Sequence, residues 1–336
     1  MTFLSTTDRS PAGVPGPLGP LRMTPGRWVA LAVAVPVALA LIGWTGFNLV
    51  SSLARGSYPF SYPIPVNNGQ VALNVTAGNI TLRAAPAARA ARLTGTVQYG
   101  LVRPGISEFI TPTGTGVGVS CFGAHISGDC GVNATLDVPL RTGVTLWSNG
   151  GDITASGFSS GMTLQAQGGN VAASELSGDL RLDTGGGDLT GTGLTGAIQL
   201  TTEGGNVDAS NLTSTGTMLI DTGGGDLNGN GLTGNLQLST EGGNVGTNGV
   251  SAQQVVVQSG GGDVTLALAE VPQSLRITAE GGNVTVILPP GDTKYAISTP
   301  DTSGGNVSYP SSLVNSNSPD TITVDSGGGN ITITQG

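Results

Sequence analysis

Aromatic and charged residues are scarce in this 336-residue chain. It contains only 6 Phe, 5 Tyr and 3 Trp, and charged residues make up 10% of it, where about 25% is usual for globular proteins. So few aromatic side chains exclude a large aromatic-rich core. Gly is abundant, with 57 residues, but Val, Ile and Leu recur at fixed intervals, which argues against a disordered glycine-rich chain.

Histidine and cysteine are also nearly absent. The single histidine, His125, leaves no evident Ser-His or Cys-His pair, so nucleophilic catalysis has no support, and we expect no cofactor. We expect the only two cysteines, Cys121 and Cys130, to form a disulfide that closes a small loop, because the topology inferred below places both in an oxidising compartment. Metal binding by this pair is the weaker alternative, since the chain has no CxxC spacing.

Basic residues are few, and the imbalance is concentrated in the second half of the chain. The whole chain carries a net charge of −9, and from Asp152 onward seventeen acidic residues face only Arg181, Arg276 and Lys294. A surface this acidic repels phosphate backbones, so we do not expect nucleic acid as a partner. Cations and basic surfaces remain open as partners.

One long apolar run is present near the N-terminus. Residues 28–50 carry no charge and would span about 34 Å as a helix, enough for a bilayer core. We predict a single transmembrane helix here. A cleaved signal peptide is the alternative, because residues 52–54 resemble a cleavage site, although the apolar run exceeds the usual length of such a signal.

The arginines on either side of this run predict its orientation. Arg9, Arg22 and Arg27 precede it and only Arg55 follows closely, so the positive-inside rule places the N-terminus in the cytoplasm. We therefore expect a single-pass protein of the cell membrane whose large C-terminal part is extracytoplasmic.

A Gly-Gly-Asp or Gly-Gly-Asn tripeptide recurs through the second half of the chain. Successive Asp or Asn residues are 18 to 24 positions apart, and a near-constant period of this length indicates a solenoid of stacked coils. The ten turn positions are Asp152, Asn170, Asp188, Asn206, Asp226, Asn244, Asp263, Asn283, Asn306 and Asn330.

Apolar residues occupy fixed places around each turn residue. They lie eight and six residues before it and one residue after it, as at Leu180, Leu182 and Leu189 around Asp188. Alternation with period two is typical of strands and not of helices. We predict an all-β fold: a β-solenoid (single-stranded β-helix) with two short strands per coil of 18–20 residues and about ten coils, about 4.8 Å apart. The unit at Asn306 breaks the register, so we expect irregular stacking over residues 289–320.

The turns also have a chemical pattern. Their glycines are expected to supply positive φ angles for tight bends. Asp and Asn alternate through the first eight turns, and Glu203, Glu241 and Glu280 stand three residues before Asn only. Like charges on adjacent coils repel by about 0.9 kcal/mol in water, so we interpret the acids as a surface whose charges are kept apart.

The acids have two alternative functional interpretations, calcium binding and catalysis on a polysaccharide. Calcium would be held between glycine-rich turns, but the calcium-binding β-roll repeats every nine residues, half the period seen here. A polysaccharide-acting enzyme would use a pair such as Asp183 and Asp221, two coils apart. Every carboxylate, however, belongs to the repeat, and Arg181 and Arg276 occupy outward strand positions where a solvated surface is the default.

The chain resembles the bacterial membrane-anchored DUF4097-type family, whose members are described as adhesin-like. The resemblance rests on the short N-terminal tail with a single apolar segment, on residues 132–140 leading into Gly-Val-Thr-Leu at 143–146, and on the recurring Gly-Gly-Asp and Gly-Gly-Asn turns. It implies a β-helix domain outside the membrane, roles in adhesion or envelope sensing, and no catalytic residues.

These observations combine into one expected organisation. We expect a non-catalytic cell-surface binding protein that presents repetitive acidic faces to a cell-wall polymer or an envelope protein. The alternatives are a polysaccharide-acting enzyme and an accessory protein of envelope-stress sensing. The expected parts are a disordered cytoplasmic tail (1–27), the transmembrane helix (28–50), a linker (51–65), an N-terminal β region that caps the solenoid (66–140) and the solenoid repeats (141–336).

Overall fold

The chain divides into two compact units, residues 1–53 and 54–336. The computed structural model describes residues 33–45, 56–64, 66, 68–100, 103, 105–111, 114–120, 130–300, 302 and 304–336. Each unit is considered by itself below.

The described part of the first unit is a helix over residues 33–45, all of them exposed. Within the described residues, no helix has both the length and the apolar character needed to cross a membrane. Residues 28–32 and 46–50 of the predicted transmembrane helix lie outside the described residues, and the membrane anchor stays a prediction. The tail over 1–27 lies outside the described residues, as do residues 51–55 of the linker.

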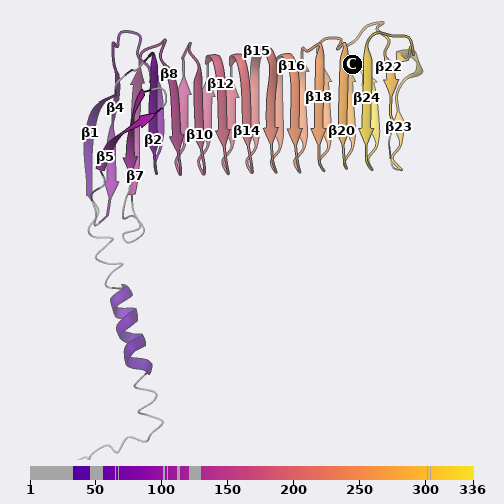
Figure 1. Ribbon diagram of the computed structural model, residues 1–336. Coiled ribbons are helices and arrows are strands. Elements are labelled where there is room, and N and C mark those ends of the chain that lie inside the picture. The colour runs from indigo at the N-terminus through magenta and orange to yellow at the C-terminus, as the bar shows by residue number, and fades with distance from the viewer. Residues whose placement is uncertain are drawn as a thin grey trace, which may run out of the picture. The chain divides into compact units, whose positions relative to one another are not determined.

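The second unit is a β-solenoid, which confirms the predicted fold class (Figure 1). Its N-terminal strands are β1 (Gly56–Ile64), β2 (Gln70–Val75), β3 (Ile80–Ala84), β4 (Ala91–Tyr99), β5 (Gly105–Thr111), β6 (Gly114–Ser120) and β7 (Cys130–Val138). The central strands are β8 (Gly143–Ser148), β9 (Ile153–Ser156), β10 (Met162–Ala166), β11 (Val171–Ser174), β12 (Ser177–Thr184), β13 (Leu189–Thr192), β14 (Thr195–Thr202), β15 (Val207–Thr222), β16 (Leu227–Thr240), β17 (Val245–Val250), β18 (Gln254–Ser259), β19 (Val264–Leu268), β20 (Ser274–Ala279) and β21 (Val284–Leu288).

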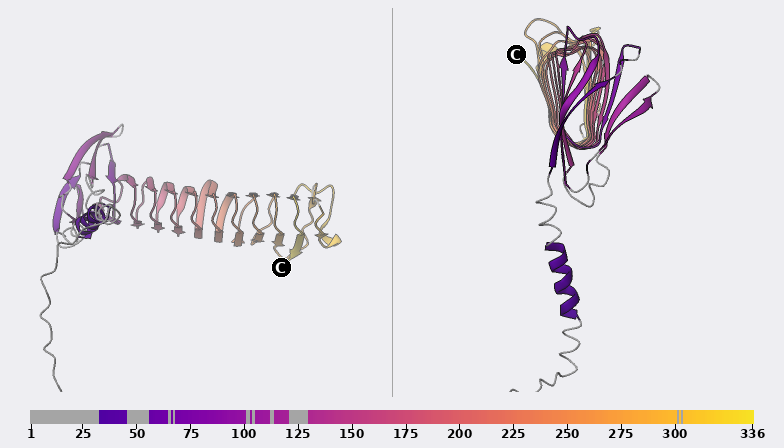
Figure 2. Two further views of the ribbon diagram at one scale, coloured as in Figure 1. Left: turned by 90° about the horizontal axis from the view of Figure 1, so that it is seen from below. Right: turned by 90° about the vertical axis from the view of Figure 1, so that its left-hand side faces the viewer.

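Each coil contributes one strand to each of two parallel faces, which lie opposite one another when the stack is viewed end-on (Figure 2). We call them the front and back faces. The front face contains β2, β8, β10, β12, β14, the second halves of β15 and β16, β18 and β20. The back face contains β3, β9, β11, β13, the first halves of β15 and β16, β17, β19 and β21.

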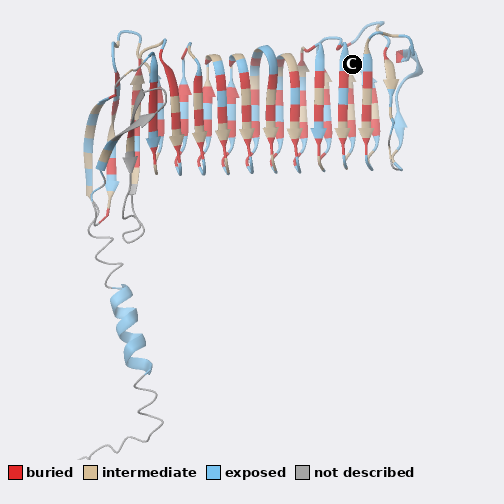
Figure 3. Ribbon diagram, viewed as in Figure 1, coloured by how far each residue is buried: buried red, intermediate tan, exposed pale blue. Residues whose placement is uncertain are grey.

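The apolar columns predicted from the repeat form the core between the two faces. Leu182, Leu189, Leu200 and Leu238 have no exposed surface, and buried residues alternate with more exposed ones along strands such as β12 and β18 (Figure 3). Burying one such leucine stabilises the fold by about 2 kcal/mol. Because each column stacks on itself in the next coil, the core is continuous along the stack.

The solenoid includes a coil that the repeat analysis did not recognise. Strands β2 and β3 pair in register with β8 and β9, so that Val71, Leu73 and Ile80 lie next to Val144, Leu146 and Ile153. The turn of this coil is at Asn79. The chain then forms β4–β7, of which β6 and β7 lie beside β2 and β3 on the side away from β8 and β9. The regular spacing therefore starts only at Asp152.

Antiparallel strands close the N-terminal end of the stack. Strand β4 pairs antiparallel with both β1 and β7, and β7 continues the back face beside β3. On the front face, β6 lies beside β2 and forms an antiparallel pair with β5. Pro59 and Pro63 of β1 provide no N–H donors, which weakens this edge as a template for further strand pairing.

The C-terminal end has an unexpected order, which is visible in the labels of Figure 1. Its elements are β22 (Ala296–Ser298), β23 (Val307–Ser308), the 3-10 helix η1 (Ser311–Leu313), β24 (Thr321–Ser326) and β25 (Ile331–Gln335). Strands β24 and β25 stack directly on β20 and β21, and β22 and β23 lie beyond them. The irregularity predicted for residues 289–320 is thus the place where the chain passes to the outermost position and then turns back.

Tyr295 is buried beside this outermost coil. Its side chain is 1% exposed, and its backbone pairs with that of Leu313 and Asn315. Burial, and secondarily the negative charge of Asp320, raise the pKa of Tyr295. Tyr295 therefore fills a core position at a point where the regular repeat is interrupted.

Two kinds of bend connect the faces. We call the Gly-Gly-Asp and Gly-Gly-Asn turns the turn edge, and the bends five residues after each turn residue the opposite bend. Left-handed conformations gather at the opposite bend, where six residues have φ between 53° and 74°: Gly157, Glu175, Gly193, Asn211, Gly231 and Gly249.

The predicted reason for the turn-edge glycines is wrong for most of them. Gly187, Gly205 and Gly225, each directly before a turn residue, are not among the residues with positive φ. A Cβ atom at Gly205 would instead lie 2.0 Å from the backbone oxygen of Gly187 in the preceding coil. The glycines are required because stacked backbones approach too closely to leave room for a side chain.

Candidate functional site

The turn residues form one continuous hydrogen-bonded ladder. In each coil the backbone N–H of the turn residue donates to the side-chain Oδ1 of the turn residue in the preceding coil, at N–O distances of 2.6 to 3.1 Å. In spatial order, the ladder comprises Asn79, Asp152, Asn170, Asp188, Asn206, Asp226, Asn244, Asp263, Asn283, Asn330 and Asn306. Each of these side chains except the last accepts a bond that joins two coils.

The ladder gives a physical reason for the alternation of Asp and Asn. The Nδ2 groups of Asn206, Asn244 and Asn283 also donate to the carboxylate of the preceding coil, at 3.1 to 3.3 Å. An Asp in the same place would bring a second negative charge and no donor. The acids therefore hold the coils together as well as being spaced along the surface.

Buried hydroxyl groups support the ladder from inside. Thr202 is 1% exposed, and its Oγ1 accepts a hydrogen bond from the N–H of Gly205 and donates one to the oxygen of Gly187. Equivalent hydroxyls at Thr184, Thr240 and Ser326 accept from the corresponding glycines. The turn edge is thus a structural element in which side-chain hydroxyls and Oδ1 atoms bind backbone groups of the same and of neighbouring coils.

The front face has a groove near its N-terminal end, lined by aromatic, amide and charged side chains. This groove of about 520 Å³ opens over β8, β10, β12 and β14, and we call it the front groove. The lining residues that matter below are Trp147, Gln165, Arg181, Asp183, Thr201 and Glu203. Strand pairing places Trp147, Gln165, Asp183 and Thr201 in one column, each in register with the next.

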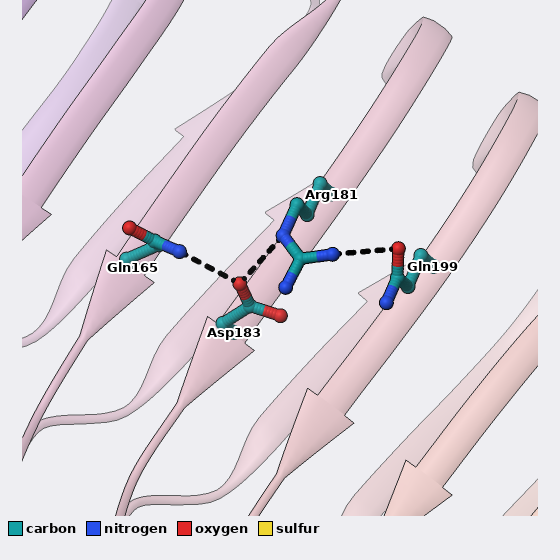
Figure 4. Close-up of polar contacts among 4 residues, drawn as sticks. All are labelled: Gln165, Arg181, Asp183 and Gln199. Atoms are coloured by element: carbon teal, nitrogen blue, oxygen red, sulfur yellow. Dashed lines mark hydrogen bonds and ion pairs between the residues drawn. The ribbon is translucent and has the colours of Figure 1, made fainter.

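A charged pair at the centre of the groove is held by two glutamines (Figure 4). Arg181 Nε lies 2.9 Å from Asp183 Oδ2, and Gln165 Nε2 donates to the same oxygen at 2.9 Å. Arg181 also donates from a terminal nitrogen to Gln199 Oε1 at 2.8 Å. Because these residues come from β10, β12 and β14, the network spans three adjacent coils.

The groove contains two buried polar atoms without a hydrogen-bond partner. They are Asp183 Oδ1 and Thr201 Oγ1, which belong to neighbouring residues of the same column. A buried polar atom without a partner costs about 1–3 kcal/mol. The Asp183 side chain is 18% exposed and that of Arg181 47%, so the charged pair itself faces the groove.

The carboxylates considered for catalysis do not form an isolated acid pair. Asp183 and Asp221 lie two coils apart in one column, with Thr201 between them, and Asp183 is bonded to Arg181 and Gln165. Arg181 lies at an outward, exposed strand position, as predicted. The sequence did not indicate that it would pair with Asp183 and Gln199 there.

Two sequence predictions concern other residues. In the described part of the chain, no group of three or more His, Cys, Asp and Glu side chains is placed to hold a metal ion. Cys121 and His125 lie outside the described residues, and only the backbone of Cys130, at the start of β7, is described. The disulfide between Cys121 and Cys130 therefore remains a prediction.

Sequence reasoning missed Trp147, Gln165 and Gln199 as parts of a site. The signal is the position five residues before each turn residue, whose residue type differs from coil to coil, so that no repeat marks it. That column holds Trp147, Gln165, Asp183, Thr201 and Asp221 in five successive coils.

Comparison with known proteins gives one broad match. A family model described as Toastrack DUF4097 matches residues 144–334, more than half of the chain. No curated protein matches the chain.

Solved structures include two distant similarities. One is described as a "putative adhesin" from Bacteroides fragilis, with 14% identity, a TM-score of 0.35, and coverage of 83% of this chain and 97% of that one. The other is a "putative cell adhesion protein" from Clostridium sporogenes, with 12% identity, a TM-score of 0.21, and coverage of 84% and 100%. Neither is close enough to carry a conclusion about this chain.

Proposed function

This chain belongs to the Toastrack DUF4097 family, and we propose that it is a non-catalytic, adhesin-like binding protein of the cell surface. In this proposal the N-terminal apolar segment anchors the chain in the cell membrane. The solenoid lies outside the membrane and presents its faces to a cell-wall polymer or an envelope protein.

The main observation behind the proposal is that the carboxylates of the turn residues form hydrogen bonds between coils. Asp152, Asp188, Asp226 and Asp263 each accept the backbone N–H of the following coil. A general acid or base needs a carboxylate aimed at a substrate, whereas these serve to fix the distance between coils. Their arrangement favours a rigid scaffold over a catalytic surface.

The shape of the solenoid also supports a binding role. Stacked coils give extended surfaces of the kind that repeat proteins use for recognition. The intercoil hydrogen bonds hold these surfaces in one geometry, so that little order has to be gained when a partner binds.

The test compares cells that carry the full chain with cells whose chain lacks residues 54–336. We expect only the full chain to promote attachment to wall polymer or to retain envelope proteins after mild crosslinking. If the two versions behave alike in both assays, the proposed binding function is wrong.

A second assay tests the non-catalytic part of the proposal. The purified full chain is incubated with a broad panel of polysaccharides, and we expect no release of shorter fragments. Fragment release that is abolished by Asp183→Asn would contradict the proposal and identify an enzyme.

A further inference from the structure

We propose that the front groove is a binding site for an uncharged oligosaccharide. This inference rests on the proposed binding function, and it adds the site and the chemical class of the ligand. Three features of the groove support it: the aromatic ring of Trp147, the hydrogen-bonding groups of Gln165 and Arg181, and the nearly balanced charge of the lining.

Trp147 supplies the apolar surface of the groove. It is partly exposed and lines the groove beside Gln165, its neighbour in the column. A sugar ring has an apolar face made of C–H groups and a polar rim of hydroxyls. A large aromatic surface next to hydrogen-bonding side chains matches both parts of such a ligand.

The polar lining provides donors and acceptors at fixed positions. Among the lining residues, Gln165 carries both kinds of group and Arg181 carries only donors. Their geometry is set in advance by the bonds to Asp183 and across Arg181. Preorganised groups of this kind lower the ordering cost of binding.

The partnerless atoms favour a hydroxylated ligand. A hydroxyl group can donate to Asp183 Oδ1 and accept from Thr201 Oγ1 at the same time. Both atoms are covered by neighbouring groups, so a ligand hydroxyl reaches them only after a local rearrangement, and the preorganised contacts are those of Gln165 and Arg181. An oligosaccharide carries several hydroxyls along its length, and the column repeats at the coil spacing of about 4.8 Å.

The groove's charge disfavours an anionic polymer. Asp183 neutralises Arg181 at 2.9 Å, which leaves Glu203 as the remaining charge among the lining residues. The surrounding half of the chain is strongly acidic, and it repels phosphate-rich or carboxylate-rich chains. Among saccharides, an uncharged chain therefore fits the groove better than an anionic one.

The experiment uses the full chain with Trp28 and Trp44 replaced by Phe, so that Trp147 is the only tryptophan. Its fluorescence is recorded during titration with neutral tetrasaccharides of glucose and of N-acetylglucosamine, with a polyuronate, with a wall-type polyphosphate and with a neutral peptide. We expect a saturable change in Trp147 emission with at least one neutral tetrasaccharide and none with the other probes.

Matched variants test whether the ligand binds in the groove or elsewhere on the front face. Asp183→Asn and Arg181→Gln are expected to weaken binding about tenfold, because each removes a charge-assisted bond from the network. Trp147→Ala, followed by calorimetry instead of fluorescence, is expected to weaken it by a similar factor. Asp325→Asn and Arg276→Gln occupy the same columns in distant coils and are expected to leave affinity unchanged.

Three results overturn the inference: no response to either neutral tetrasaccharide, a response only to an anionic probe or the peptide, or equal losses in groove and control variants. If Trp147→Ala leaves attachment of whole cells intact, the chain is a binding protein whose site lies elsewhere. If the unaltered chain neither attaches nor binds a saccharide, the proposed function fails together with the site.

Discussion

The turn edge and the opposite bend join the same two faces, yet they tolerate very different residues. At the turn edge, Gly, Asp or Asn, and a buried hydroxyl recur in coil after coil because neighbouring backbones touch and bond to each other. At the opposite bend, Glu175, Gly193 and Asn211 occupy the same place in successive coils, since the only shared requirement is a left-handed φ. Contact between coils restricts sequence more strongly than local conformation does.

The largest expected effect is that of Gly205→Ala at the turn edge. The new Cβ would lie 2.0 Å from the oxygen of Gly187, so the two coils must separate, and we expect a loss of about 3 kcal/mol in unfolding free energy. Urea denaturation monitored by circular dichroism measures it. Gly224→Ala is the control, because nothing lies within 4 Å of its Cβ; equal losses would contradict the close-approach explanation.

The next effect concerns the buried hydroxyl of Thr202. Thr202→Val keeps the shape but leaves the N–H of Gly205 and the oxygen of Gly187 without this partner, so we expect a loss of about 2 kcal/mol. Thr201→Val, at the adjacent residue whose buried Oγ1 has no partner, is expected to be neutral or stabilising in the same denaturation assay. If Thr201→Val lowered the free energy of unfolding more than Thr202→Val, the hydroxyl of Thr202 would not stabilise the turn.

A smaller loss of stability is expected when the alternation of Asp and Asn along the ladder is interrupted. Asn206→Asp places three carboxylates in succession and removes the donor to Asp188, and we expect a loss of about 1 kcal/mol that shrinks in high salt. Asp188→Asn keeps the Oδ1 acceptor and serves as the control, with little expected change. Denaturation at two ionic strengths tests this; a salt-independent loss would rule out charge repulsion as its cause.

The smallest effect lies at the opposite bend. Glu175 has φ of 53°, a conformation that costs a side-chain-bearing residue about 1 kcal/mol relative to glycine. Glu175→Gly is therefore expected to stabilise the solenoid by about 0.5 kcal/mol, after the greater unfolded-chain entropy of glycine is subtracted. Gly193→Glu should have the opposite sign. If Gly193→Glu proves as harmful as Gly205→Ala, the two bends are equally constrained and the comparison fails.

Much of the fold could be predicted because the core columns repeat. Residues such as Leu182, Leu200 and Leu238 recur at one position relative to the turn, and period two identifies them as inward-facing strand residues. The coil around Asn79 escaped detection because its turn has Ala77-Gly78 in place of two glycines, and a long excursion separates it from the next coil.

The front groove could not be predicted in the same way. Trp147, Gln165 and Asp183 share a column but not a residue type, so no repeat marks them. The bond between Arg181 and Asp183 depends on two residues of one strand turning toward each other outside the core, which the alternation of strands does not specify. The proposed binding groove therefore lies where the repeat varies, while the most regular residues hold the coils together.

The position of β24 and β25 has a consequence for how the chain is assembled. Residues 321–335 are synthesised after residues 296–308, yet they lie between that coil and β20–β21. The outermost coil therefore has no surface to stack on until these later residues have emerged and entered the gap. The end of the stack is therefore completed in the reverse of synthesis order. A chain cut before residue 321 loses the contacts of two coils, because the outermost coil has nothing left to stack on.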